Sequence, residues 1–203
     1  NIDLIDPPAT EIVIRLVPLV IAMIFWGLGM AVQTFRPTDG AADIFFAWCL
    51  GSATTLTAGV ASYFGPLWAS SLFNSLLWLI GPLSVHFHLL FPQSNSLRKK
   101  RWLLLLLYGI PLIGVFPVMV YGLQGINLLA KYPQVSAMGR VYLGVNLLAV
   151  VVLLFYNYRH AVTPGTRSKI RLLALGGGIT GVSIVSMTIL PDALFHQPIL
   201  PYY

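Results

Sequence analysis

The sequence predicts an all-α protein, a polytopic bundle of about six transmembrane helices. Of its 203 residues, 57% are hydrophobic and 9% are charged, whereas about a quarter of the residues of a soluble domain are charged. The mean hydropathy is +0.82. Apolar runs of about 20 residues, long enough to cross a hydrocarbon core roughly 30 Å thick, recur along the chain. They lack the strict polar/apolar alternation of membrane β-barrel strands, so a helical bundle is expected.

The first three expected spans are bounded by proline, glycine or charge, which interrupt a spanning helix. They cover about 11–32, 43–63 and 67–91. The boundaries are Arg36-Pro37, Gly65-Pro66 and Pro92, in that order.

The other three expected spans cover about 102–121, 140–158 and 170–190, and Pro191 closes the last. Together the six spans form one bundle over residues 11–191. Residues 1–10 (NIDLIDPPAT) are expected to be an extracytoplasmic segment, the possible end of a preceding domain. Residues 192–203 are expected to be external and to lead to a further span.

The distribution of basic residues predicts the orientation of the bundle. The net charge of +6 comes from 12 Lys+Arg against 6 Asp+Glu, and nine of the twelve fall in loops on one side. The positive-inside rule makes this side cytoplasmic and both ends of the chain extracytoplasmic. Because these residues sit in short loops between apolar runs, we expect contact with anionic lipid head groups and no nucleic acid partner. The residues of this set expected at head groups are Arg98, Lys99, Lys100, Arg101, Arg167, Lys169 and Arg171.

No catalytic, metal or cofactor site is expected within these residues. The predicted spans hold no Asp, Glu, Lys or Arg at mid-membrane, which disfavours a proton relay or a path for a charged substrate. The single cysteine, Cys49, lies in an apolar run and excludes an internal disulfide. We therefore expect no enzymatic activity from the chain itself.

His86 and His88 are the intramembrane histidines. Two residues on a helix correspond to a rotation of about 200°, so the two side chains are expected on opposite faces and cannot share one metal ion. A haem with two histidine ligands would need a partner on another span, and the sequence offers none. We interpret both as groups that bond head groups or neighbouring helix ends, with pH or ligand sensing as the alternative.

Small and amide side chains predict close packing between helices. Gly51, Thr55 and Gly59 repeat at four-residue spacing, and Gly177 and Gly181 form a GxxxG pair, a pattern that lets helices approach closely. Packing within the chain is favoured over a dimer face.

Asn74 and Asn146 are the polar residues expected to bond across helices. They could instead line a small-ligand cavity, but a role in core packing is favoured.

The segment SVHFHLLFPQSNSLRKKRWLLLLLYGIPL resembles the membrane input modules of bacterial sensor histidine kinases of the competence-pheromone-receptor type. FRPTDGAADIFFAWCL and TRSKIRLLALGGGITG are similar to two further loop-and-span signatures of that family. The resemblance implies a bacterial inner membrane, an extracytoplasmic domain before the bundle, often PDZ-like, and a further span leading to a cytoplasmic transmitter. The phosphoacceptor helix and the ATP-binding domain are not among these residues, so only an input role is implied.

The expected function is therefore a signal-input module that passes an external or intramembrane stimulus to a cytoplasmic output domain. The alternative is an accessory or scaffold subunit of a larger membrane complex, respiratory or photosynthetic, without catalysis of its own. Expected partners are the lipid bilayer and other membrane subunits or a second copy of the chain.

Overall fold

The computed structural model describes residues 9–63, 66–92, 101–126, 132–161 and 163–184. These residues form six helices and no strand, which confirms the all-α fold class. The helices are α1 (Ala9–Phe35), α2 (Gly40–Tyr63), α3 (Leu67–Leu90), α4 (Arg101–Leu123), α6 (Pro133–Arg159) and α7 (Pro164–Ile184).

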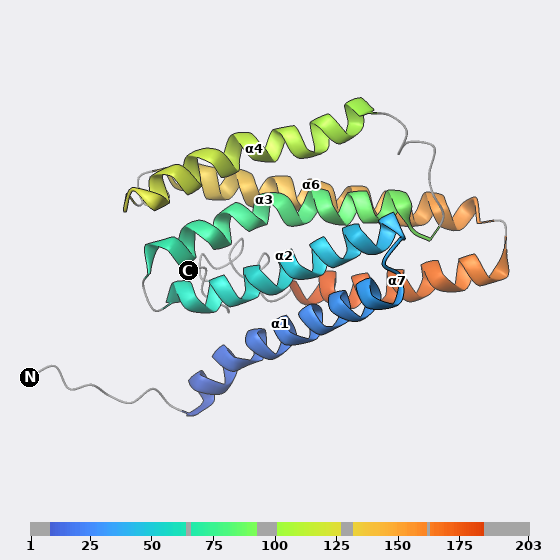
Figure 1. Ribbon diagram of the computed structural model, residues 1–203, viewed down its shortest axis with the longest axis horizontal. Helices are drawn as coiled ribbons and strands as arrows, with labels where there is room; N and C mark the ends of the chain where they lie inside the picture. Colours follow the sequence, from blue (N-terminus) through green and yellow to red (C-terminus); the bar gives the residue numbers. More distant parts are fainter. Residues whose placement is uncertain (1–8, 64–65, 93–100, 127–131, 162, 185–203) are drawn as a thin grey trace, which may run out of the picture.

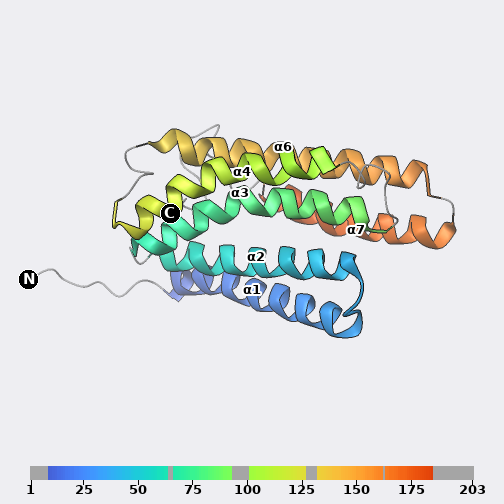
Figure 2. The same ribbon diagram turned by 45° about the horizontal axis from the view of Figure 1, so that its top comes forward.

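The helices run side by side along one long axis and alternate in direction (Figures 1 and 2). The central helix is α3, which packs against α2, α4 and α6, while α1 packs on α2 and α7 packs on α6. The apolar segment of α3 is 56% buried, against 11% to 28% for the apolar segments of α1, α2, α4 and α6. Side chains of α3 are therefore the ones placed to connect different parts of the bundle.

Five of these helices, α1, α2, α3, α4 and α6, are long and apolar enough to cross a membrane. The mean hydropathy of their apolar segments lies between 1.3 and 2.4. The α7 helix does not qualify over its described length, because Arg167, Lys169 and Arg171 lie in its first half. Residues 185–190 of the expected sixth span lie outside the described residues, as do 1–8 and 192–203.

Two helices begin earlier than expected because proline starts them. The α6 helix begins at Pro133 rather than near 140, and α7 begins at Pro164 rather than near 170. Proline suits the first turn of a helix, where its missing N–H has no intrahelical partner. The α7 start also has a cap, since the backbone N–H of Thr166 donates to Thr163 Oγ1 at 3.2 Å.

The start of α2 is fixed in a similar way by Asp39. Its carboxylate accepts a hydrogen bond from the backbone N–H of Ala41 at 2.9 Å, in the manner of a helix cap. The same side chain lies 3.8 Å from the guanidinium of Arg36. The turn that reverses the chain between α1 and α2 is thereby held by one acidic side chain.

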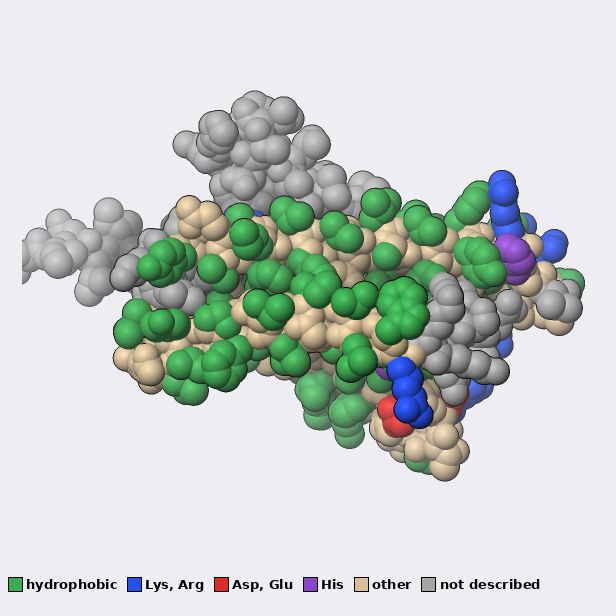
Figure 3. Space-filling model, turned by 90° about the horizontal axis from the view of Figure 1, so that it is seen from above, with side chains coloured by type: hydrophobic (Ala, Val, Ile, Leu, Met, Phe, Trp, Pro, Cys, Tyr) green, Lys and Arg blue, Asp and Glu red, His purple; other side chains and the backbone are tan. Residues whose placement is uncertain are grey.

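Apolar side chains hold α3, α6 and α7 together. The largest buried cluster consists of Val85, Leu89, Val150, Leu153, Leu154, Ala161 and Ile170. It lies toward the end of the bundle where α3 and α6 finish and α7 begins. That end also carries the basic residues of the described loops and helix ends, as Figure 3 shows for one face of the molecule.

Candidate functional site

The candidate site is the set of polar side chains buried along α3. The helix buries five of them, namely Ser71, Asn74, Ser75, Ser84 and His88. Hydrogen bonds are costly to leave unmade in an apolar interior, so these side chains need partners on α3 itself or on the helices around it. Bonds to α6 from the Asn74 side chain and the His88 backbone carbonyl position α3, whereas the buried Ser75 Oγ has no hydrogen-bond partner among the described residues.

Near the start of α3, Asn74 bonds both its own helix and α6. Its Nδ2 donates to the carbonyl oxygen of Ser70 at 2.9 Å, and its Oδ1 accepts a hydrogen bond from Ser136 Oγ at 2.8 Å. Arg140 extends the contact, because its Nη1 donates to Ser136 Oγ at 3.0 Å. The expected interhelical role of Asn74 thus corresponds to a three-residue network between α3 and α6.

In the middle of the bundle, Trp78 of α3 fits against two glycines. A Cβ at Gly139 of α6 would lie 2.7 Å from the indole Nε1, and a Cβ at Gly114 of α4 would overlap the same ring. The indole also stacks on the ring of Tyr142, with a centroid separation of 5.6 Å. Trp78 is therefore a packing residue that sets the spacing of three helices.

Asn146 packs closely against α3. Its Nδ2 donates to the carbonyl oxygen of Tyr142 on its own helix at 2.8 Å, and its Cβ would lie 2.8 Å from a Cβ at Gly81. A cross-helix bond in this layer comes instead from Tyr142, whose hydroxyl donates to the carbonyl oxygen of Leu107 on α4 at 2.9 Å. The structure thus places Asn146 in close packing against α3.

Near the other end of α3, His86 meets α4. Its Nδ1 lies 2.8 Å from the hydroxyl of Tyr108, and the two rings meet edge to face at 5.8 Å. This contact lies at the end where α4 begins. It joins α3 to the first turns of the helix that follows the basic RKKR segment.

His88 points to a different part of the bundle and is only 6% exposed. Its ring Nδ1 lies 2.8 Å from the carbonyl oxygen of Ser84. The backbone carbonyl of His88 accepts a hydrogen bond from Asn157 Nδ2 of α6 at 3.3 Å. The residue four positions on is Pro92, which has no N–H for this carbonyl, so Asn157 supplies the donor that the α3 sequence lacks.

The two histidines thus have different surroundings, as their spacing predicts. Within the described residues, no group of three or more His, Cys, Asp or Glu side chains could hold a metal ion.

Asn157 is the main residue that the sequence interpretation missed. It is 1% exposed and follows Asn146 by eleven residues, which is about three helical turns. Both amides therefore lie on the α6 face toward α3. That spacing was a usable signal in the sequence.

Aromatic rings fill the contact between α2 and α3 at the same end. Trp48 stacks on Phe87 with a centroid separation of 6.1 Å and meets Phe25 of α1 edge to face at 6.2 Å. Phe45 completes the cluster at 5.2 Å from Phe87. These rings attach the α1–α2 pair to the histidine-bearing end of α3.

The small residues of α2 face α3, in keeping with packing within the chain. A Cβ at Gly59 would lie 3.3 Å from the ring of Phe73, and one at Gly51 would lie 3.7 Å from Leu83. Thr55 is buried, and its hydroxyl donates to the carbonyl oxygen of Gly51 at 2.8 Å. Gly177 and Gly181 lie on α7, beyond the residues whose side-chain contacts the structure describes.

The described basic residues of the predicted cytoplasmic side lie at one end of the bundle. Arg101 opens α4, and Arg167, Lys169 and Arg171 lie in the first turns of α7. Arg171 is anchored there, because its Nη2 donates to the hydroxyl of Tyr158 at 2.7 Å. Arg98, Lys99 and Lys100 lie outside the described residues.

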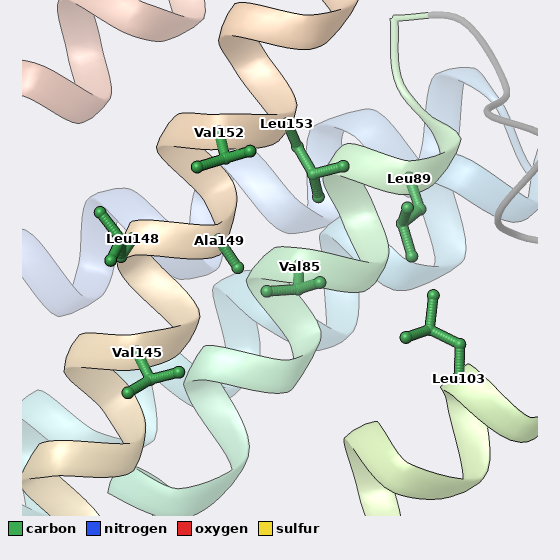
Figure 4. Close-up of a pocket in the computed structure, with 8 residues that line it drawn as sticks. All are labelled: Val85, Leu89, Leu103, Val145, Leu148, Ala149, Val152 and Leu153. Carbon is green, nitrogen blue, oxygen red and sulfur yellow. The ribbon is translucent and has the colours of Figure 1, made fainter.

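An apolar groove of about 430 Å³ lies beside the polar contacts of α3. Figure 4 shows that α3 and α6 supply most of its lining and that Leu103 of α4 lies across from them. The lining residues are Val85, Leu89, Leu103, Val145, Leu148, Ala149, Val152 and Leu153. All eight side chains are aliphatic, so the groove suits an apolar occupant.

In comparisons with protein-family models, curated proteins and solved structures, nothing matches this chain.

Proposed function

We propose that this chain is a membrane-embedded signal-input module, related to the input modules of bacterial sensor histidine kinases. In this proposal, the helices cross the inner membrane and an external or intramembrane stimulus shifts their packing. The shift then passes to a cytoplasmic output domain elsewhere in the same product. The proposal has two parts, insertion in the membrane and transmission of a signal.

The exposed apolar surface supports insertion in a membrane. Large hydrophobic side chains are exposed on several helices, including Met23 at 74% on α1, Ile113 at 78% on α4 and Leu148 at 65% on α6. Soluble monomers rarely expose contiguous apolar surface on this scale, whereas lipid accommodates it. The basic end of the bundle would be cytoplasmic by the positive-inside rule.

Transmission is supported by the position of α3, and this is the observation that carries the proposal. Near one end, α3 bonds α6 through Asn74 and Ser136. Near the other end, it contacts α4 through His86 and Tyr108. A shift of α3 at the external end would therefore change contacts at the basic end, which an input module requires.

The resemblance gives the direction of the signal. The stretch SVHFHLLFP, which carries the family resemblance, contains both histidines of α3 and lies at the basic end. In a sensor kinase this end faces the transmitter domain. The polar contacts of His86 and His88 would then lie where the output is controlled.

The test is autophosphorylation of the full-length product in lipid nanodiscs. Tyr108→Phe removes the hydroxyl that meets His86, and Tyr121→Phe is the matched control on the exposed part of α4. A hydrogen bond is worth about 1 kcal/mol, so a Tyr108→Phe variant should change basal autophosphorylation by about fivefold. Absence of phosphorylation under every stimulus tried would contradict the proposal.

A second candidate function is an accessory subunit of a larger membrane complex. The outer face of α4 favours it, since Leu105 and Phe116 are 73% and 71% exposed and would offer a packing surface. Stoichiometric purification with a respiratory or photosynthetic complex, without any transmitter domain in the open reading frame, would support this candidate over the sensor.

A further inference from the structure

The apolar groove between α3, α4 and α6 has a buried floor and exposed edges. Val85, Leu89 and Leu153 are 7%, 1% and 9% exposed, whereas Leu148 and Val152 on α6 are 65% and 60% exposed. The groove is thus open to the side of the bundle along α6 (Figure 4). If the chain lies in a membrane, as proposed above, this side faces lipid.

The exposed edge of the groove leads along α6 to a cation. Val145, Leu148, Val152, Phe155 and Arg159 follow at intervals of three or four residues and so form one stripe on the helix. The guanidinium of Arg159 lies over the ring of Phe155, 4.4 Å from its centroid. This stacking holds the positive charge in line with the groove.

The length of this stripe matches one leaflet of a bilayer. Val145 and Arg159 are 14 residues apart, or about 21 Å at 1.5 Å per residue. Half of a bilayer that is roughly 40–45 Å thick with its head groups is about the same distance. An acyl chain lying in the groove would therefore place its head group at the level of Arg159.

The charge around the open end suits an anionic head group. Arg101 opens α4 two residues before the groove residue Leu103, and Arg167, Lys169 and Arg171 lie at the same end of the bundle. No Asp or Glu occurs in the sequence between Asp43 and Asp192. The described acids Asp39 and Asp43 lie at the α1–α2 turn, where they contact Arg36 and Gln33.

We propose that this groove binds the acyl chain of an anionic phospholipid from the cytoplasmic leaflet, with the phosphate at Arg159. The aliphatic lining takes the chain, and the cation-bearing end selects the head group. The inference rests on the proposed membrane insertion. It adds a defined lipid site between the helices that would move during signalling.

The test is native mass spectrometry of the detergent-purified chain titrated with dioleoylphosphatidylglycerol or dioleoylphosphatidylcholine. We expect one tight adduct that favours the anionic lipid. One cation near an anionic surface is worth about 1 kcal/mol, so Arg159→Gln should lower that preference by about fivefold. Arg36→Gln, at the same end but paired with Asp39 in the α1–α2 turn, should leave it within about twofold.

A second pair of variants tests the groove itself. Ala149→Phe fills the lined space and should weaken the tight adduct of both lipids. The control, Ile113→Phe, places the same ring on an exposed part of α4 that does not line the groove and should leave it unchanged. If Ala149→Phe does not fold, the exposed Arg159→Gln still decides the question.

Three results would overturn the lipid site. These are equal binding of the two lipids to the unaltered chain, equal loss of the preference with Arg159→Gln and Arg36→Gln, or an experimental structure in lipid that shows a protein helix in the groove. Alkaline carbonate extraction of cell membranes that contain the chain separates this failure from that of the proposed function. A chain that stays in the membrane without lipid preference contradicts only the site, whereas a chain that is released contradicts membrane insertion as well.

Discussion

Ser136 on α6 donates a 2.8 Å hydrogen bond to the side-chain oxygen of Asn74 on α3, across 62 positions of the sequence. This bond joins two helices whose other contacts are largely apolar. Around it, the glycines and the tryptophan of the middle layer set the distance between the helices.

We predict a measurable coupling between Asn74 and Ser136. Each single alanine variant should lower the free energy of unfolding, and the double variant should lose less than the sum. Bonds of this kind between membrane helices are worth about 0.5–1.5 kcal/mol, so the coupling energy should fall in that range. The measurement is reversible unfolding in mixed micelles; a coupling of zero would contradict the bond.

Close packing at Gly139 predicts a strong effect of a single methyl group. Gly139→Ala would place a Cβ 2.7 Å from Trp78 Nε1 and should destabilise the fold by about 1–3 kcal/mol through overpacking. Gly144→Ala is the matched control on the same helix, with open space around the added Cβ. It should leave stability unchanged or raise it by up to about 1 kcal/mol. Equal effects of the two variants would contradict the close packing of Trp78 against Gly139.

Asn157 should be required for a stable end of α3. Asn157→Leu removes the amide that donates to the carbonyl oxygen of His88. Pro92 has no N–H to replace it, and a buried acceptor without a donor costs about 1–3 kcal/mol. The measurement is the midpoint of thermal unfolding in detergent. Gln134→Leu, which replaces an exposed amide on the same helix, is the control and should change the midpoint little. Equal shifts of the midpoint would mean that any amide-to-leucine change on α6 destabilises the protein, and would contradict a specific role of Asn157.

The proposed sidedness predicts a labelling pattern in intact cells. In a Cys49→Ala background, a Gln134→Cys variant should react with a membrane-impermeant maleimide from outside, and a Ser168→Cys variant only after lysis. Both positions are exposed in the structure and lie at opposite ends of the bundle. Reaction of Ser168→Cys alone from outside would reverse the orientation, and reaction of both would argue against a membrane barrier between them.

Most helix positions followed from the sequence, because long apolar runs and their boundaries are local properties of the chain. The helices that begin at Pro133 and Pro164 start seven and six residues before the expected spans, since polar first turns hide the beginning of a helix in a hydropathy pattern. The opposite faces of His86 and His88 followed from helical geometry alone. The partner of His86 did not, because Tyr108 lies on another helix.

The sequence by itself determined the helical class, the approximate helix ends and the gathering of basic residues in alternate connections. Only the tertiary structure decided that α3 is central, that Asn157 completes its last turn and that an aliphatic groove leads toward Arg159. The physical reason is that apolarity and charge act residue by residue, whereas neighbours depend on how helix faces pack. In this chain nearly every helix face is apolar, so the pattern alone does not distinguish the buried face from the exposed one.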